Sequence, residues 1–175
     1  MMESQGILTG VERTFDVDDI IVSKTDIKGR ITYANRVFMR VAGYTEKALI
    51  NTQHNIIRRP QMPRCVFKLL WERIEDRKEI FAYVMNRAGN GDHYWVFAHV
   101  TPTFDGGGNI IGYHSTRRKP DRRIVENTIV LVYRLLLDEE KKHANDKEGL
   151  RASSDKLKHI LAERGSTYDE LIFSL

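Results

Sequence analysis

The chain has 175 residues, of which 41% are hydrophobic and 30% charged, a composition typical of a globular protein and not of a disordered one. No apolar run approaches the roughly 20 residues that a membrane-spanning helix needs. The net charge of +4 is concentrated in residues 1–119 but is too diffuse there to indicate nucleic-acid binding. The single cysteine, Cys65, excludes an intramolecular disulfide, and residues 1–10 lack a secretory signal, so we expect a cytoplasmic protein without direct membrane insertion.

The first half of the chain predicts a polar leader followed by a strand hairpin. Residues 1–18 are polar and form the leader. The β-branched run at 20–26 and the short run at 31–35 predict two strands, and the Lys-Gly-Arg sequence at 28–30 predicts the turn between them.

Two short helices are expected next. Asn35 is placed to cap a helix that ends at Gly43, and Thr45 is a candidate cap for a second helix. The following stretch, 51–62, contains too many polar and proline residues for a long helix.

The middle of the chain predicts one amphipathic helix and three strands. Pro63 is expected at the first helical position, and apolar residues recur behind it at three- and four-residue spacing. Glycine-containing turns at 89–92 and 105–109 separate the runs that follow. The predicted strands are residues 80–88, 93–104 and 110–118.

After Pro120 the sequence predicts a helical tail. Two apolar series run along the first helix, one through Ile124, Leu131 and Leu135 and one through Val125, Ile129, Val132 and Leu136. This stripe is wider than a two-stranded seam needs, and it packs on the sheet, on a second copy or on a partner. A second helix is predicted over 153–165 with Ser154 or Asp155 as its cap, and a third over 167–175 with Thr167 as its cap.

Three motifs resemble the PAS family: D-x-x-G-x-I-T-Y-A-N at 26–35, F-x-x-x-x-G-Y at 38–44 and N-G-D-x-Y-W at 90–95. The resemblance implies an α+β PAS fold, a five-stranded antiparallel sheet with flanking helices, joined here to the C-terminal helical segment. We expect a leader over 1–18, a PAS sensor domain over 19–119 and a signalling or dimerisation segment over 120–175.

More narrowly, the H-N-x-x-R run at 54–58 and the later N-R…N-G-D-H-Y-W turn resemble the FAD-binding PAS domains of Aer-type energy-taxis receptors. Those receptors also carry membrane, HAMP and signalling segments, which are absent from this sequence. The resemblance is therefore to the CetB arrangement, in which a separate flavin sensor pairs with a membrane transducer.

The resemblance implies a set of residues that hold the cofactor. His54, Arg58, Trp71 and Asn86 match positions of the family's flavin site. Arg58 and Arg59 suit phosphate, a tryptophan face suits a flat ring, and the Asn86 amide offers both a donor and an acceptor. Asn35 and Tyr94 complete the candidate set.

Other ligands remain open, because Arg59-Pro60-Gln61 stands where the flavin family usually has His-Pro-Asp. His54 is an axial ligand if the cofactor is haem b, in an oxygen-sensing PAS domain; no other metal site is expected. A ligand-free PAS adaptor is the third alternative. Cys65 lacks the sequence context of a light-driven flavin adduct and is interpreted as helix packing.

The resulting expectation is a non-enzymatic redox sensor, since no catalytic triad, phosphate-binding loop or cysteine pair is recognisable. Reduction of FAD would change the charge and hydrogen bonding around Asn86, and the sheet would bias the helical tail. We expect a homodimer that signals redox or oxygen state to a chemotaxis-type transducer, which recruits it to the membrane.

Overall fold

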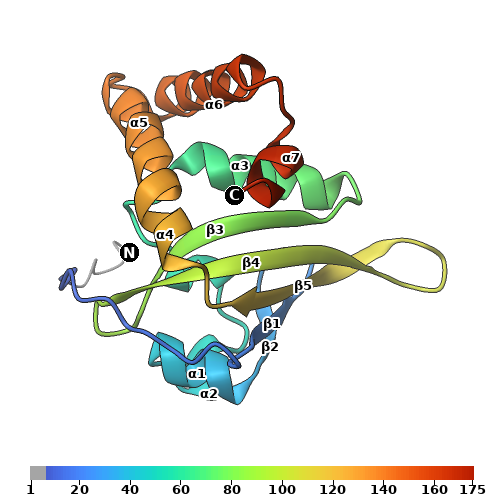
Figure 1. The fold of residues 1–175 in the computed structure, drawn as a ribbon. Helices are drawn as coiled ribbons and strands as arrows, with labels where there is room; N and C mark the ends of the chain where they lie inside the picture. Colours follow the sequence, from blue (N-terminus) through green and yellow to red (C-terminus); the bar gives the residue numbers. More distant parts are fainter. Residues whose placement is uncertain (1–6) are drawn as a thin grey trace.

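The computed structural model describes residues 7–175 and contains one antiparallel sheet with helices on either side (Figure 1). The five strands are β1 (Ile21–Thr25), β2 (Ile31–Ala34), β3 (Ile80–Arg87), β4 (His93–Phe104) and β5 (Ile110–Arg118), in the spatial order β2-β1-β5-β4-β3. Short helices connect β2 to β3: α1 (Arg36–Ala42), α2 (Glu46–Leu49), the 3₁₀ turn η1 (His54–Ile57) and the longer α3 (Arg64–Glu75). The tail contains α4 (Arg122–Ile124), a π-helical segment (Val125–Ile129), α5 (Val130–Lys141), α6 (Asp146–Glu163) and α7 (Tyr168–Phe173).

The predicted fold class is confirmed, and each strand ends within one residue of its predicted bounds. The caps of the first two helices are also as predicted. The Asn35 side chain accepts a hydrogen bond from the backbone N–H of Phe38, and Gly43 ends α1 in the left-handed conformation. Thr45 caps α2 in the same way as Asn35 caps α1.

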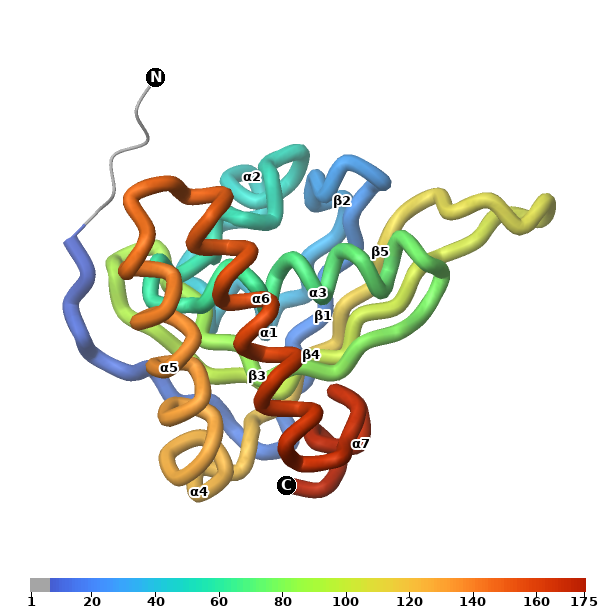
Figure 2. Tube along the Cα trace, turned by 90° about the horizontal axis from the view of Figure 1, so that it is seen from above, coloured from blue at the N-terminus to red at the C-terminus, as the bar shows by residue number. Residues whose placement is uncertain are grey.

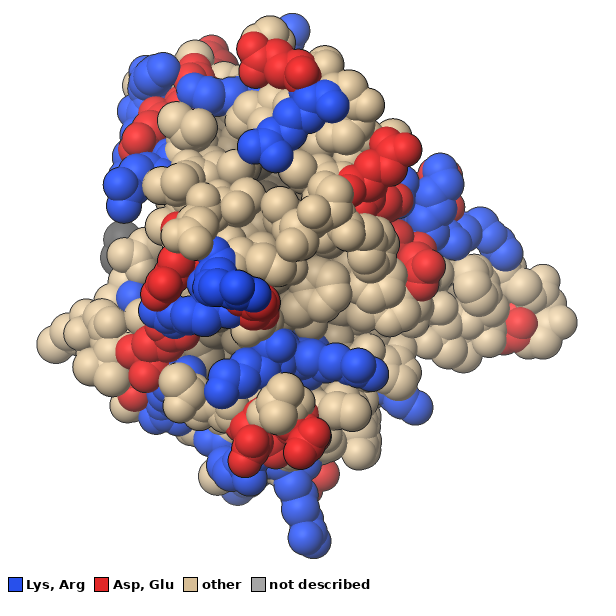
Figure 3. Space-filling view, viewed as in Figure 1, with Lys and Arg blue, Asp and Glu red and all other residues tan. Residues whose placement is uncertain are grey.

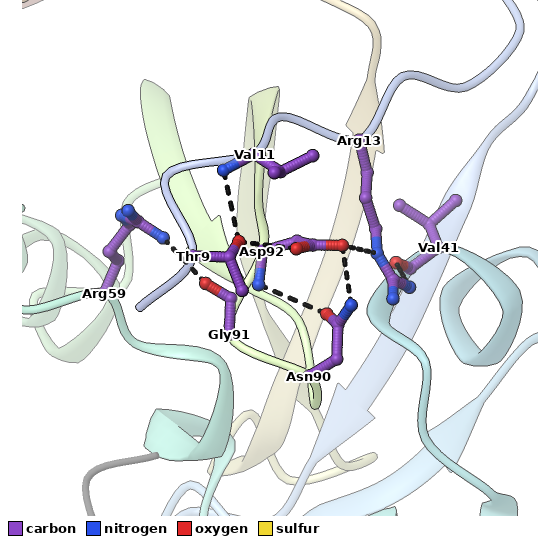
Figure 4. A network of polar contacts seen from close by, with 8 residues as sticks. All are labelled: Thr9, Val11, Arg13, Val41, Arg59, Asn90, Gly91 and Asp92. Atoms are coloured by element: carbon purple, nitrogen blue, oxygen red, sulfur yellow. Dashed lines mark hydrogen bonds and ion pairs between the residues drawn. The ribbon is translucent and has the colours of Figure 1, made fainter. Parts of the chain in front are cut away.

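The leader segment is fixed to the turn between β3 and β4 by one carboxylate (Figure 4). Asp92 accepts hydrogen bonds from the Thr9 hydroxyl at 2.6 Å, the Asn90 amide at 2.7 Å and Arg13 Nε at 3.0 Å. These three donors lower the pKa of Asp92 to about 2. The N-G-D turn that marked the family in the sequence therefore also anchors the segment that precedes the sheet.

The tail packs on the edge strand β3 and on the outer face of the sheet. The Tyr133 hydroxyl donates a hydrogen bond of 2.6 Å to the backbone carbonyl of Tyr83. The Tyr133 ring lies 6.2 Å from Trp95, and Phe173 meets Phe81 edge-on at 4.8 Å. This packing covers a strand edge that would otherwise present unpaired backbone groups.

Only one of the two apolar series on the first tail helix is buried by this packing. Val125, Ile129 and Leu136 belong to the main hydrophobic core. In contrast, Leu131 and Leu135 are 52% and 49% exposed. The hydrophobic core thus buries one of the two series and leaves Leu131 and Leu135 of the other exposed.

A buried carboxylate joins the tail to α3. Oε1 of Glu140 in α5 accepts hydrogen bonds from the backbone N–H of Arg64 at 2.7 Å and from the Ser153 hydroxyl at 3.0 Å. The Cys65 N–H lies within 3.4 Å of the same oxygen. Pro63, predicted as the first helical residue, precedes α3 and supplies no cap, so Glu140 caps this helix from a distant part of the chain.

The prediction for the second tail helix was wrong at its start. The helix begins at Asp146 with Asn145 as its cap, seven residues before the predicted 153–165. Ser154 and Asp155, the predicted caps, lie inside the helix, where the Ser154 hydroxyl donates to the carbonyl of Leu150. The third helix, capped by Thr167, is confirmed.

Gly149 lies in the part of this helix that was not predicted. A glycine near a helix start reads as a break, but here the helix crosses α5 so closely that a Cβ at this position would lie 2.6 Å from the carbonyl oxygen of Glu140. The glycine permits the crossing. Seen from above, α6 runs across α3 (Figure 2).

Within residues 7–175, no helix combines the length and the apolar content that crossing a bilayer requires. On the face shown in Figure 3, acidic and basic side chains alternate and do not form a basic groove.

Candidate functional site

A cavity of about 310 Å³ lies between the inner face of the sheet, η1 and α3. Its size is at the lower end of the roughly 300–1,000 Å³ typical of small-molecule pockets. Most of the lining is apolar, with Phe67, Leu70 and Ile74 on the helix side and Val84 and Val100 on the sheet side. A flat, largely apolar molecule fits such a space.

The sheet side of the cavity contains a buried cation. Arg117 is 2% exposed, and its guanidinium lies 4.5 Å above the Phe38 ring. One nitrogen donates to the Ser23 hydroxyl, whereas Nε and the other terminal nitrogen have no hydrogen-bond partner among residues 7–175. Burial lowers the pKa of Arg117 to about 10, so the group stays charged at neutral pH. A buried guanidinium with unpaired donors is costly unless an acceptor, from water or from a ligand, meets them.

The hydroxyl of Ser23 links Arg117 to His54 in a chain of hydrogen bonds. Guanidinium only donates, so Ser23 accepts from Arg117 and donates its own hydrogen to His54 Nε2, 3.0 Å away. His54 is then neutral with its proton on Nδ1. Burial, followed by the charge of Arg117, lowers the pKa of His54 to about 3.

This environment predicts a pH effect on stability. Unfolded His54 takes up a proton below pH 6.5, whereas folded His54 stays neutral until about pH 3. The free energy of unfolding should therefore fall by about 2 kcal/mol from this group between pH 7 and pH 5. Urea unfolding at the two pH values should show a smaller difference for His54→Gln than for wild type. The exposed His159→Gln should keep the wild-type difference, and an equal difference in all three proteins would contradict the assignment.

Trp71 stands at the open side of the cavity and not in its depth. It is 36% exposed and meets Tyr113 edge-on at 5.5 Å. Gly29, in the turn between β1 and β2, has φ +75° and leaves only 3.2 Å from an added Cβ to the indole ring. The glycine thus serves both the turn and the close approach of the tryptophan.

Arg58 and Asn86 lie together at the end of β3. Their backbones form an isolated antiparallel bridge, which brings η1 to the edge of the sheet. The Asn86 side chain is 4% exposed and lines the cavity. The Arg58 guanidinium lies 4.9 Å above the Phe67 ring, at the boundary between cavity and surface.

Four of the seven candidate residues therefore line one cavity: His54, Arg58, Trp71 and Asn86. The other three lie outside it. Asn35 caps α1 and accepts from the backbone N–H of Val22. Tyr94 is fully buried, and its hydroxyl has no partner among residues 7–175.

Arg59, the seventh candidate, points toward the turn between β3 and β4 (Figure 4). Its Nε donates to Gln61 at 2.5 Å, and one terminal nitrogen lies 3.4 Å from the carbonyl oxygen of Gly91. This chain departs from the flavin family at its Arg-Pro-Gln sequence, and there Arg59 contacts Gln61 and the turn between β3 and β4.

Sequence reasoning missed the cation at the centre of the site. Arg117 belongs to a basic run at 117–119 and looked like the end of a strand. The two-residue period of a strand could have identified Arg117. Tyr113, Ser115 and Arg117 alternate along β5 and share the face that lines the cavity.

The described residues contain no cluster of three or more His, Cys, Asp or Glu side chains that could hold a metal ion. Haem ligation through His54 Nε2 would require breaking its bond to Ser23. Cys65 is buried beneath the tail, and burial raises the pKa of its thiol to about 11, which agrees with a packing role.

The model of the PAS fold family matches residues 17–118. The aerotaxis receptor of Escherichia coli K12 is 36% identical over 118 residues, which are 67% of this chain and 23% of the receptor. The nitrogen fixation regulatory protein of Klebsiella pneumoniae is 29% identical over 99 residues, which are 57% of this chain and 20% of that protein. The matched part of the chain therefore spans only about a fifth to a quarter of the length of these relatives.

Solved structures show the same fold at low identity. The dark structure of the blue-light photoreceptor Aureochrome1 LOV matches with a TM-score of 0.54 and 22% identity, over 69% of this chain and 84% of that chain. The PAS domain of a protein from Colwellia psychrerythraea matches with a TM-score of 0.55 and 16% identity, over 59% and 88% of the two chains.

Proposed function

The chain belongs to the PAS family, and from this we propose that its cavity binds the ring of FAD non-covalently and that the protein senses redox or oxygen state. The observation that carries the proposal is the buried Arg117 with its unpaired donors in an otherwise apolar cavity. A flavin ring is flat and apolar over most of its surface, and it presents carbonyl oxygens and a ring nitrogen along one edge.

The residues of the cavity suit both parts of such a ring. The apolar side chains of α3 and β3 would cover its faces, while Arg117 and Asn86 would meet its polar edge. A bound flavin supplies a reversible redox change that alters the charge and protonation of its ring. Arg117 would favour added negative charge, and the Asn86 amide can donate or accept by rotating.

The signal would leave through α3. This helix lines the cavity with Phe67 and Trp71, and its first turn is capped by Glu140 of the tail. A shift of α3 that changes the cap would bias the tail between docked and released arrangements.

The similarity to an aerotaxis receptor supports a sensory and non-enzymatic role. We propose that this protein acts in the cytoplasm as a homodimer and signals to a chemotaxis-type membrane transducer, which recruits it to the membrane. The exposed Leu131 and Leu135 on the tail suit contact with a second copy or with the transducer.

The test is the absorption spectrum of the purified protein, before and after reconstitution with FAD. The proposal predicts flavin bands that remain after desalting and bleach with dithionite. A Soret band in place of flavin bands would show that the bound cofactor is haem b and would overturn the FAD proposal. A colourless protein that binds no FAD but still forms a stable complex would support the alternative of a ligand-free adaptor.

A further inference from the structure

A second hollow of about 800 Å³ opens beside the cavity, and the tail forms one of its sides. We refer to it as the tail groove. Asn55 and Arg58 line both spaces, so the tail groove adjoins the cavity at these two residues. From the tail itself the lining includes Leu137, Glu140, Lys141 and His143.

The tail groove carries positive charge that the protein does not neutralise. Within residues 7–175, no carboxylate forms an ion pair with Arg58, Arg87 or Lys141, and Arg87 Nε is buried without a hydrogen-bond partner. The one acid in the groove, Glu140, is already occupied by the N-terminus of α3 and by Arg64, 3.4 Å away. The remaining cations therefore face an open space in which an anion would be stabilised.

The groove also offers apolar surface. Tyr44, Pro60 and Leu137 contribute to its lining, so a heteroaromatic base can lie against it next to the basic residues. An apolar cavity that adjoins a basic groove with an aromatic side chain matches a ligand with three parts. These are a flat ring, a linked diphosphate and a second aromatic base.

Resting on the proposed function, we propose that the tail groove binds the diphosphate and adenosine of the same FAD molecule whose ring occupies the cavity. Arg58 lies at the junction, and Arg87 and Lys141 are the phosphate ligands. Lys141 follows directly after Glu140 at the end of α5, so the tail itself becomes part of the ligand site.

This arrangement gives the ligand two functions. Its ring part contacts the sheet and α3, and its phosphate part holds the tail against them. A dinucleotide would therefore stabilise the docked tail, whereas riboflavin, which lacks phosphate, would not.

Binding of riboflavin, FMN and FAD to the full chain, followed by flavin fluorescence, tests the inference. We expect wild type to bind FAD about 100-fold more tightly than riboflavin, with a ratio that falls as salt rises. Lys141→Glu should weaken FAD binding about tenfold and leave riboflavin binding unchanged. The control is Arg134→Glu, which makes the same charge change at an exposed position of α5 that does not line the groove.

The outcomes separate the two claims. Equal affinity of wild type for riboflavin and FAD would show that the tail groove does not bind the diphosphate and adenosine. It would not contradict binding of the flavin ring in the cavity. If Lys141→Glu and Arg134→Glu weaken FAD binding equally, Lys141 is not a phosphate ligand. The change in net charge alone then explains the weaker binding. Failure of all three flavins to bind would overturn the proposed function and, with it, this inference.

Discussion

The Arg117→Met variant is expected to be more stable than wild type in the absence of ligand and to bind flavin at least about tenfold more weakly. Methionine fills much of the same volume without a charge or unpaired donors, so the folded state no longer contains an uncompensated buried guanidinium. The expected gain in the free energy of unfolding is about 1 kcal/mol. Urea unfolding and FAD titration measure the two effects.

The opposite signs make this variant informative, since a merely structural arginine would lower stability when removed. Arg118→Met is the matched control, because the neighbouring side chain is exposed on the same strand. It should change neither quantity appreciably. An Arg117→Met protein that is less stable than wild type and binds FAD normally would contradict the assignment of Arg117 to a ligand.

Glu140→Ala is expected to lower the free energy of unfolding by roughly 2–4 kcal/mol. The carboxylate is buried and accepts from the Arg64 N–H and the Ser153 hydroxyl. In the variant the Arg64 N–H loses its partner, whereas the Ser153 hydroxyl keeps only the Leu150 carbonyl, 3.1 Å away. The α3 helix also loses its cap. Urea unfolding measures the loss, and alkylation of the buried Cys65 should become faster because the tail undocks more often.

Glu139→Ala is the matched control for this prediction. Glu139 is the preceding residue of the same helix, but it forms surface ion pairs with Lys142 and Lys156. Its loss should change stability and Cys65 alkylation far less. Glu140→Gln keeps one acceptor oxygen and should lie between wild type and Glu140→Ala. Equal effects of the two alanine variants would show that the cap does not couple the tail to α3.

Local signals made most of the fold predictable. The strands follow β-branched runs separated by glycine turns, and Asn35, Gly43 and Thr167 act at helix ends as their chemistry requires. The apolar stripe predicted that the tail is partly buried but left open whether it packs on the sheet, on a second copy or on a partner. Local rules missed the first part of α6, in which Gly149 lies against Glu140 of another helix.

The candidate site was predictable in part for the same reason. His54, Arg58, Trp71 and Asn86 come from the family motif and do line one cavity. Arg117 was missed because its neighbours along the chain are exposed cations, and only the pairing of β5 with β1 places it beside Ser23. The tail groove was equally hidden, since Lys141 reaches it only after the tail folds back over the sheet.

The central claim is that a redox change in the cavity reaches the tail through α3. Anaerobic alkylation of Cys65 by iodoacetamide in the FAD-loaded protein, before and after photoreduction, tests it most directly. Cys65 lies in the first turn of α3 beneath the tail, so its reactivity reports docking. We predict that oxidised and reduced proteins differ several-fold in alkylation rate and that Glu140→Ala reduces the difference. Equal rates in the two redox states of wild type would contradict the claim.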